Sequence, residues 1–201
     1  MTPSTHQIAG CVLAGGLGRR LGGLDKGLVD LAGQPLVAHV VARFAPQVNA
    51  LAISANRNLE SYRAHATAVL PDADAEDGAG PLAGIATALA WCPAPLLAIV
   101  PCDSPFLPVH LVTTLDAARR RAGATVAVAR TADGLQPMFA LLAAELAVAA
   151  RAALRTGERK VERWYRQQAL VEVDLETERA ALANLNTPQD LAAAQLRLAA
   201  A

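Results

Sequence analysis

The sequence predicts an α/β protein with a three-layer, doubly wound and mostly parallel sheet of the Rossmann-like type. Short, continuously apolar runs such as Ile8–Leu13 and Leu96–Pro101 alternate with longer runs of helical character. Strands that are covered on both faces of a sheet have this uninterrupted apolar pattern. The 201 residues contain no repeat or change of composition that would divide them. Because this length suits one domain with a sizeable core, we expect a single domain over residues 1–201.

The individual elements follow from apolar periodicity and from capping and turn residues. The predicted strands are Ile8–Leu13, Ala50–Ser54, Ala68–Leu70, Leu96–Pro101, Ala124–Ala129, Met138–Leu142 and Ala169–Asp174. The predicted helices are Pro35–Phe44, Pro81–Trp91, Pro108–Ala122, Ala144–Thr156, Lys160–Gln168 and Pro188–Leu198. The last helix has a defined start, because Thr187 can cap it and Asp190 has the spacing of a capping box. In such sheets, ligands bind beyond the C-terminal ends of the strands.

The composition excludes several classes of protein. Apolar residues make up 53 % of the chain and aromatic residues 3 %, so the core must consist mainly of Ala, Leu and Val. The formal net charge is zero, which argues against a nucleic-acid partner. No apolar run has the length of a membrane span and the first residues lack a signal-peptide pattern, so we expect a cytoplasmic protein. Cys11, Cys92 and Cys102 match no zinc pattern and no disulfide framework, and we expect Cys11 and Cys92 to be small buried hydrophobic residues. Cys102 lies beside a candidate site but has no evident base partner, so we do not expect it to be a nucleophile.

A glycine-rich and basic stretch follows the first predicted strand and runs from Leu13 to Gly27. Glycines let the backbone approach a ligand closely and direct its N–H groups toward it. Arg19, Arg20 and Lys26 add positive charge that suits phosphate oxygens. An ordinary surface loop rarely has this composition directly after a buried strand. The stretch therefore predicts a cradle for the phosphates of a nucleoside triphosphate.

Spacing excludes the two best-known phosphate motifs. A P-loop ends in Gly-Lys-Ser/Thr, whereas Lys26 lies between Asp25 and Gly27. A dinucleotide fingerprint has the pattern Gly-x-Gly-x-x-Gly, and the next glycine after Gly18 comes one residue too late for it. The loop must belong to another class of nucleotide-binding protein.

A carboxylate follows the strongly apolar strand that ends at Pro101. Asp103 would lie at the same edge of the sheet as the glycine-rich stretch, which suits a Mg²⁺ ion held against phosphate. A helix N-cap is the alternative reading of this position. Asp72 follows another predicted strand and is the best ligand candidate in an acidic loop whose other charges we expect to be solvated. Gly80 then precedes a helix whose N-terminus can face an anion.

Two polar segments late in the chain could bind an acceptor. The first, Thr156–Val161, is basic and contains Lys160. The second places Asn184 and Asn186 at a strand-to-helix turn. A solvated helix start and ordinary turn formation are the alternative readings of these segments.

These motifs together resemble those of the molybdenum cofactor guanylyltransferases, within the nucleotidyltransferases of sugar-nucleotide-transferase-like (nucleotide-diphospho-sugar transferase) fold. The opening segments match, with Leu21 in place of the family's methionine. The matching segments are Leu13–Gly16, Arg20–Gly23, Asp25–Leu28, Gly33–Leu36, Gly80–Gly84, Pro101–Pro105, Gln136–Pro137, Gly157–Lys160 and Asn184–Leu191. They cover nearly the whole chain in the same order.

The resemblance implies transfer of GMP from GTP to molybdopterin phosphate, with or without molybdenum, giving the guanine dinucleotide cofactor and pyrophosphate. It implies Mg²⁺, with Mn²⁺ as a substitute, and transient contact with cofactor-biosynthesis or molybdoenzyme-chaperone proteins. The implied nucleotide-binding residues are Leu13, Ala14, Gly15, Gly16, Lys26, Ser54, Asp72 and Asp103. The implied catalytic residues are Arg20, Lys26 and the metal ligand Asp103, and the implied acceptor residues are Gln136, Lys160, Asn184 and Asn186.

One position departs from the family pattern. The family often has asparagine at the end of the second strand, where this chain has Ser54, with Asn56 two residues later. Serine can still donate and accept a hydrogen bond, but its reach is shorter.

The residues suit an in-line displacement at the α-phosphorus of the nucleotide. The acceptor phosphate is already a nucleophile at neutral pH, so no strong general base is required, and cationic groups must offset the repulsion between two anions. Three other functions are compatible with the sequence: a cytidylyltransferase for the same pterin, a sugar-1-phosphate nucleotidyltransferase, and a nonenzymatic adaptor that binds nucleotide and cofactor. The short chain argues against the second, and the combination of Arg20, Lys26 and Asp103 argues against the third.

Overall fold

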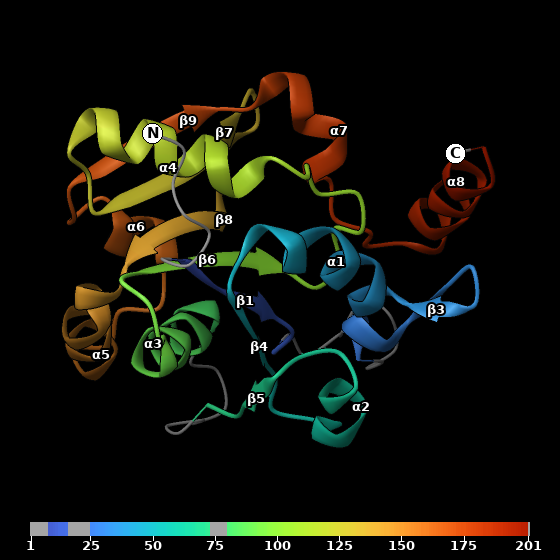
Figure 1. Cartoon of the computed structure of the whole chain (residues 1–201), viewed down its shortest axis with the longest axis horizontal. Helices are drawn as coiled ribbons and strands as arrows, with labels where there is room; N and C mark the ends of the chain where they lie inside the picture. Colours follow the sequence, from blue (N-terminus) through green and yellow to red (C-terminus); the bar gives the residue numbers. More distant parts are fainter. Residues whose placement is uncertain (1–7, 16–24, 73–79, 201) are drawn as a thin grey trace.

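The structure is a computed structural model that describes residues 8–15, 25–72 and 80–200. Within these residues, seven strands form a central sheet in the order β5-β4-β1-β6-β8-β7-β9, and β2 and β3 form a separate hairpin (Figure 1). The strands are β1 (Ile8–Leu13), β2 (Asp30–Leu31), β3 (Gln34–Pro35), β4 (Ala50–Ser54), β5 (Ala68–Leu70), β6 (Leu96–Pro101), β7 (Val126–Thr131), β8 (Gly134–Ala143) and β9 (Leu170–Asp174). The predicted α/β, mostly parallel architecture is confirmed.

Helices lie on both faces of this sheet (Figure 1). They are α1 (Leu36–Phe44), α2 (Leu59–Arg63), α3 (Pro81–Trp91), α4 (Leu111–Ala122), α5 (Ala147–Arg155), α6 (Val161–Tyr165), α7 (Arg179–Leu182) and α8 (Pro188–Ala199). One core layer includes Phe44 of α1 and Leu115 of α4, and the other includes Ile85 of α3 and Trp164 of α6. Both layers are largely aliphatic, as the composition predicts. None of the helices described combines the length and apolar character needed to cross a membrane.

The register of the parallel strands brings four strand ends to one level. Leu13 of β1 lies opposite both Ser54 of β4 and Pro101 of β6, and Ser54 lies opposite Leu70 of β5. The backbone stays paired just beyond these ends, because the N–H of Ala14 donates to the Ser54 carbonyl over 2.8 Å. The loops that follow β1, β4, β5 and β6 therefore leave the sheet along one edge, and this edge carries the candidate site.

Most differences from the predicted elements lie at their boundaries. The strand predicted over Met138–Leu142 extends over Gly134–Ala143, because it forms an antiparallel hairpin with β7 whose tight turn places Gly134 at φ 106°. The helix predicted over Lys160–Gln168 is shorter, covering Val161–Tyr165. The short helices α2 and α7 carry too few residues for a periodic pattern and were not predicted. The predicted capping box at Thr187 and Asp190 is confirmed.

The cysteines are thiols, as expected. Cys11 and Cys102 are buried, whereas the prediction of a buried Cys92 was wrong, because this residue follows the end of α3 and is half-buried. Burial raises the pKa of Cys11 to about 12. Burial and the neighbouring carboxylate of Asp103 also raise the pKa of Cys102 well above its usual range. Since a thiolate is the reactive form, neither group is suited to nucleophilic chemistry.

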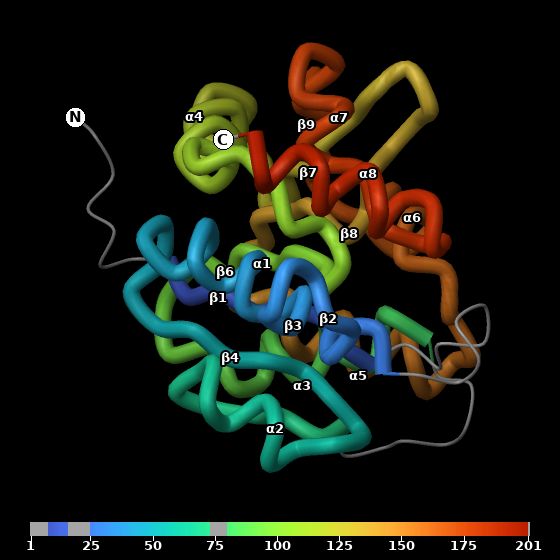
Figure 2. The backbone as a smooth tube through the Cα atoms, turned by 90° about the vertical axis from the view of Figure 1, so that its right-hand side faces the viewer, coloured from blue at the N-terminus to red at the C-terminus, as the bar shows by residue number. Residues whose placement is uncertain are grey.

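The C-terminal segment returns to the site edge and ends in α8. Figure 2 shows α8 on the same side of the molecule as α1 and the β2–β3 hairpin. A small apolar cluster joins these parts through Leu31, Leu36, Leu185 and Ala194. The guanidinium of Arg197 lies 4.0 Å from the centroid of the Phe106 ring, a cation–π contact that adds to this docking.

Candidate nucleotide-transfer site

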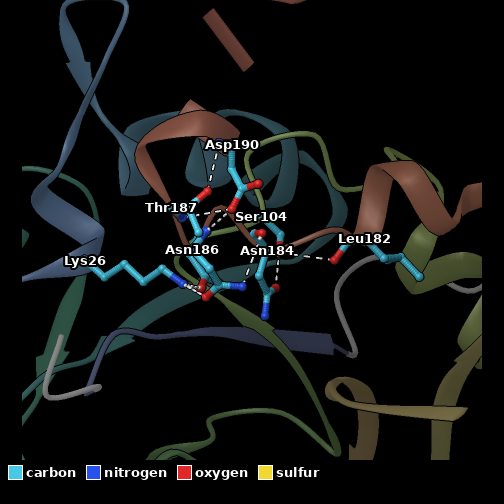
Figure 3. A network of polar contacts seen from close by, with 8 residues as sticks. Lys26, Ser104, Leu182, Asn184, Asn186, Thr187 and Asp190 are labelled. Atoms are coloured by element: carbon cyan, nitrogen blue, oxygen red, sulfur yellow. Dashed lines mark hydrogen bonds and ion pairs between the residues drawn. The ribbon is translucent and has the colours of Figure 1, made fainter. Parts of the chain in front are cut away.

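Lys26 is the centre of a polar cluster at the C-terminal edge of the sheet. Its Nζ donates to Oδ2 of Asp103, and to Oδ1 of Asn186 over 2.6 Å (Figure 3). Lys26 begins a 3₁₀ turn at the end of the glycine-rich stretch, Asp103 follows β6, and Asn186 precedes α8. Three segments that are distant in the sequence therefore meet at one ammonium group.

Asp103 is a buried carboxylate, and only one of its two oxygens has a hydrogen-bond partner in the described part of the chain. The residue is 7 % exposed, and its backbone carbonyl accepts from the N–H of Leu185 over 2.9 Å. Its Oδ1 is buried and has no hydrogen-bond partner among the described residues. A buried polar atom without a partner costs stability, so such an atom next to a cationic side chain marks a place where a ligand can bind.

The donor set around Asp103 fits a hard divalent cation. Within the described residues there is no group of three or more His, Cys, Asp or Glu side chains that could enclose a metal ion. Mg²⁺ in nucleotide-dependent enzymes needs no such cage, since it is held by one or two carboxylates together with substrate phosphates and water. Oδ1 of Asp103, which has no hydrogen-bond partner in the described part of the chain, could supply a ligand of this kind.

A second polar pair lies beside the end of β1. Nδ2 of Asn56 donates to Oδ2 of Asp72 over 2.9 Å, and the N–H of Asp72 donates to Oδ1 of Asn56 over 2.8 Å. A Cβ on Gly15 would lie 3.8 Å from Nδ2 of Asn56, so this pair borders the start of the glycine-rich stretch. Oδ1 of Asp72 is also buried and without a partner in the described part of the chain. The edge thus offers two carboxylates, each with a free oxygen.

Ser54 and Asn56 occupy different environments. The Ser54 side chain is buried below α3, where a Cβ on Gly84 would lie 2.9 Å from its Oγ. Asn56 is exposed and reaches Asp72. Sequence reasoning did not include Asn56 among the site residues, although its position two residues after β4 was the available signal.

Two hydrogen bonds hold the side chain of Asp25, the residue that precedes Lys26. The carboxylate of Asp25 accepts from the hydroxyl of Tyr62, and from Nδ2 of Asn58 over 3.0 Å. Tyr62 is fully buried, and burial together with the hydrogen bond to Asp25 raises the pKa of this phenol far above its usual value. The neutral hydroxyl therefore stays a donor at physiological pH and connects the Lys26 turn to α2.

Substitution of Gly27 by alanine is expected to destabilise the protein by about 1–3 kcal/mol. The added Cβ would lie 2.5 Å from Oη of Tyr62, whose ring is enclosed by the core and cannot move freely. Thermal unfolding of Gly27→Ala should show a transition lowered by several degrees. The loss should be smaller when Gly27→Ala is added to Tyr62→Phe, which lacks the hydroxyl. An unchanged melting temperature for Gly27→Ala would contradict this packing argument.

Of the other residues predicted to bind the acceptor, Asn184 lies close to Asp103, whereas Gln136 and Lys160 form hydrogen bonds within their own segments. Asn184 accepts through Oδ1 from the hydroxyl of Ser104 over 2.7 Å, which places it next to the Asp103 loop (Figure 3). Gln136 donates to Oγ1 of Thr131 over 3.1 Å in the β7–β8 hairpin. The N–H of Lys160 donates to Oε1 of Glu158 over 2.9 Å. Gly16 and Arg20 lie outside the described residues.

Comparison with known proteins agrees with this arrangement. The family model of the MobA-like NTP transferase domain matches residues 10–173. The chain belongs to this family. A molybdenum cofactor guanylyltransferase from Burkholderia vietnamiensis is 45 % identical over 198 residues, covering 94 % of this chain and 96 % of its own. Another from Shewanella amazonensis is 41 % identical over 185 residues, covering 92 % and 94 %. This MobA-like chain is therefore a nucleotidyltransferase.

Solved structures share the fold. A molybdopterin-guanine dinucleotide biosynthesis protein A from Archaeoglobus fulgidus superposes with a TM-score of 0.79 at 24 % identity, over 96 % of this chain and all of that one. A protein from Mycobacterium tuberculosis, solved in complex with manganese, has a TM-score of 0.68 at 19 % identity, over 94 % and 98 %. At these identities the likeness concerns the fold alone.

Proposed function

We propose that this MobA-like chain transfers GMP from GTP to the phosphate of molybdopterin or its molybdenum complex, releasing pyrophosphate. The observation that carries the proposal is the Lys26–Asp103 pair at the end of β6, whose second carboxylate oxygen has no partner in the residues that the structure describes. Transfer of a nucleotidyl group to an anionic acceptor requires positive charge that offsets the repulsion between the two substrates. A cationic side chain and a metal-binding carboxylate at this edge can provide it. The relatives named as guanylyltransferases, which span nearly the whole chain, support the choice of substrates.

Asp103 is the proposed ligand of the divalent cation. Bound there, Mg²⁺ or Mn²⁺ would neutralise phosphate charge and favour departure of pyrophosphate. The M. tuberculosis protein of the same fold was solved in complex with manganese, a divalent ion of the kind proposed here. Asp72 has a free oxygen as well, and we assign it to the nucleoside, with Asn56 holding its other oxygen.

The residues of the chain perform the remaining tasks. Leu13 ends β1, and Ala14 and Gly15 follow it beside the Asn56–Asp72 pair, so these three residues can line the nucleoside. The positive charge of Lys26 stabilises the bound triphosphate and the negative charge that develops in the transition state. An oxygen of the acceptor phosphate attacks the α-phosphorus, a new P–O–P link forms, and the bond to the β-phosphate oxygen breaks. The acceptor phosphate is already ionised at neutral pH, so this step needs no general base.

Pyrophosphate release with Mg²⁺ and the pterin phosphate is expected with GTP and not with CTP, ATP or UTP. The choice of nucleotide depends on a few contacts to its base near the strand ends, so enzymes with the same catalytic residues can use different nucleotides. A coupled pyrophosphate assay with each nucleotide measures this directly. Preference for CTP would replace the guanylyl assignment by a cytidylyl one. Nucleotide binding without release from any nucleotide would indicate the nonenzymatic adaptor.

A further inference from the structure

We propose that Asp190, on the first turn of α8, is a positioning residue that holds Lys26 in place through Asn186. The proposal rests on the proposed function for the role of Lys26, and it adds a residue to which no part of the reaction has been assigned. It concerns a segment beyond residue 173, where the match to the family model ends.

The contacts form a short chain from α8 to the ammonium group (Figure 3). Oδ2 of Asp190 accepts from the N–H groups of both Asn186 and Thr187, each over 2.8 Å. The side chain of Asn186 then accepts from Nζ of Lys26 over 2.6 Å. One carboxylate oxygen thus fixes the backbone of the residue whose amide holds the lysine.

A lysine side chain needs such support because it is long and flexible. Its four-carbon stem has many rotamers, and holding one of them costs conformational entropy. Asp103 constrains Nζ from one side only, and this carboxylate must also face the metal and phosphates. Asn186 supplies a second, uncharged acceptor from another segment, so Lys26 can keep its position when the surroundings of Asp103 change.

The position of Asp190 is itself fixed by the packing of α8. α8 packs on the β2–β3 hairpin and α1 through Leu31, Leu36 and Ala194, close in sequence to Lys26. The backbone N–H donors of Asn186 and Thr187 lower the pKa of Asp190, so the carboxylate is ionised throughout the physiological range. The docked helix α8, the ionised carboxylate of Asp190 and the side-chain amide of Asn186 together hold Lys26 in place.

The test separates positioning from helix capping by comparing two halves of one capping box. Asp190→Ala removes the acceptor that holds Asn186. Thr187→Ala removes the acceptor for the N–H of Asp190, a bond of 3.1 Å that stabilises α8, and the hydroxyl that contacts the Asp190 carboxylate. It leaves both backbone N–H donors to that carboxylate, from Asn186 and Thr187, in place. We expect Asp190→Ala to lower kcat/KM for GTP by about 10-fold or more, and Thr187→Ala to retain activity despite a similar loss of Tm. Asp190→Asn keeps an oxygen acceptor and should restore most of the activity.

A double-mutant cycle tests whether Asp190 acts through Asn186. If it does, Asp190→Ala should add little loss of activity in a protein that already carries Asn186→Ala. Independent, multiplicative losses would overturn the proposal. Equal losses of activity in Thr187→Ala and Asp190→Ala would also overturn it, because simple destabilisation of α8 would then be sufficient.

A second readout does not depend on turnover. The chain has two lysines, Lys26 and Lys160, and Lys160 is exposed. The nucleotide-free protein is treated with N-hydroxysuccinimidyl acetate, and acetylation of each lysine is followed by peptide mass spectrometry. Asp190→Ala should raise the ratio of Lys26 to Lys160 labelling several-fold over wild type, whereas Thr187→Ala should not. An unchanged ratio would overturn the proposal, whereas a wild-type protein that releases no pyrophosphate would overturn only the proposed function.

Discussion

Lys26→Ala is expected to lower the rate of GMP transfer by about 10²–10³-fold, because one preorganised electrostatic donor typically contributes this much. The ammonium group lies between Asp103 and Asn186 at the strand edge, where it can offset the charge of the triphosphate. The measurement is kcat and kcat/KM for GTP in the pyrophosphate assay. A loss in both would indicate stabilisation of the transition state, and a rise in KM alone would indicate uniform binding.

The control variants address the side effects of removing the lysine. Lys26→Met keeps most of the apolar stem without the charge, and it should lose activity to the same extent as Lys26→Ala. Arg130→Ala breaks an exposed ion pair with Glu172, at 3.2 Å in the β7–β9 part of the sheet, and should retain normal turnover. Turnover near the wild-type rate in Lys26→Met would defeat the assignment of Lys26.

Asp103→Ala is expected to abolish GMP transfer together with its dependence on Mg²⁺. The variant removes the buried oxygen that has no hydrogen-bond partner among residues 8–15, 25–72 and 80–200, and with it the proposed protein ligand of the ion. It also leaves Lys26 without its carboxylate partner, so the thermal stability of the variant must be measured alongside activity. Activity is measured over a titration with Mg²⁺ and, separately, with Mn²⁺.

Asp103→Asn serves as the matched comparison for this carboxylate. The amide preserves the size of the side chain but removes the negative charge that binds a divalent cation. We expect a folded protein with a strongly raised Mg²⁺ requirement and a large loss of activity. A fully active Asp103→Ala protein with the wild-type Mg²⁺ requirement would move the metal ligand elsewhere.

Local features of the site could be predicted from the sequence. The capping box of Thr187 and Asp190 needs only neighbouring residues in the right order, so it could be recognised directly. Asp103 could be placed at the strand edge because the run Leu96–Pro101 is uniformly apolar and ends just before it. The role of Asp103 in binding the metal ion and the nucleotide remains a prediction, which the Asp103 variants test.

Other features required knowledge of which segments meet. Ser54 was predicted to contact the nucleotide, and its side chain lies buried beneath Gly84, whereas Asn56 pairs with Asp72. The two residues differ because α3 covers Ser54 and leaves Asn56 exposed, and the spacing of residues does not show which helix covers a strand end. The anchor of Asp25 on Tyr62 likewise depends on α2, a helix too short for its periodicity to be recognised.

By itself the sequence determined the α/β class, the positions of the seven strands of the sheet within the described residues, and the strand ends that carry polar side chains. Continuous apolar runs and local turn residues are sufficient for this, because they report on burial and backbone conformation over a few positions. Only the tertiary structure decided that Lys26 meets both Asp103 and Asn186. That meeting depends on β1 lying next to β6 and on α8 returning to the β2–β3 hairpin. Packing between distant segments sets these contacts, and local patterns do not specify them.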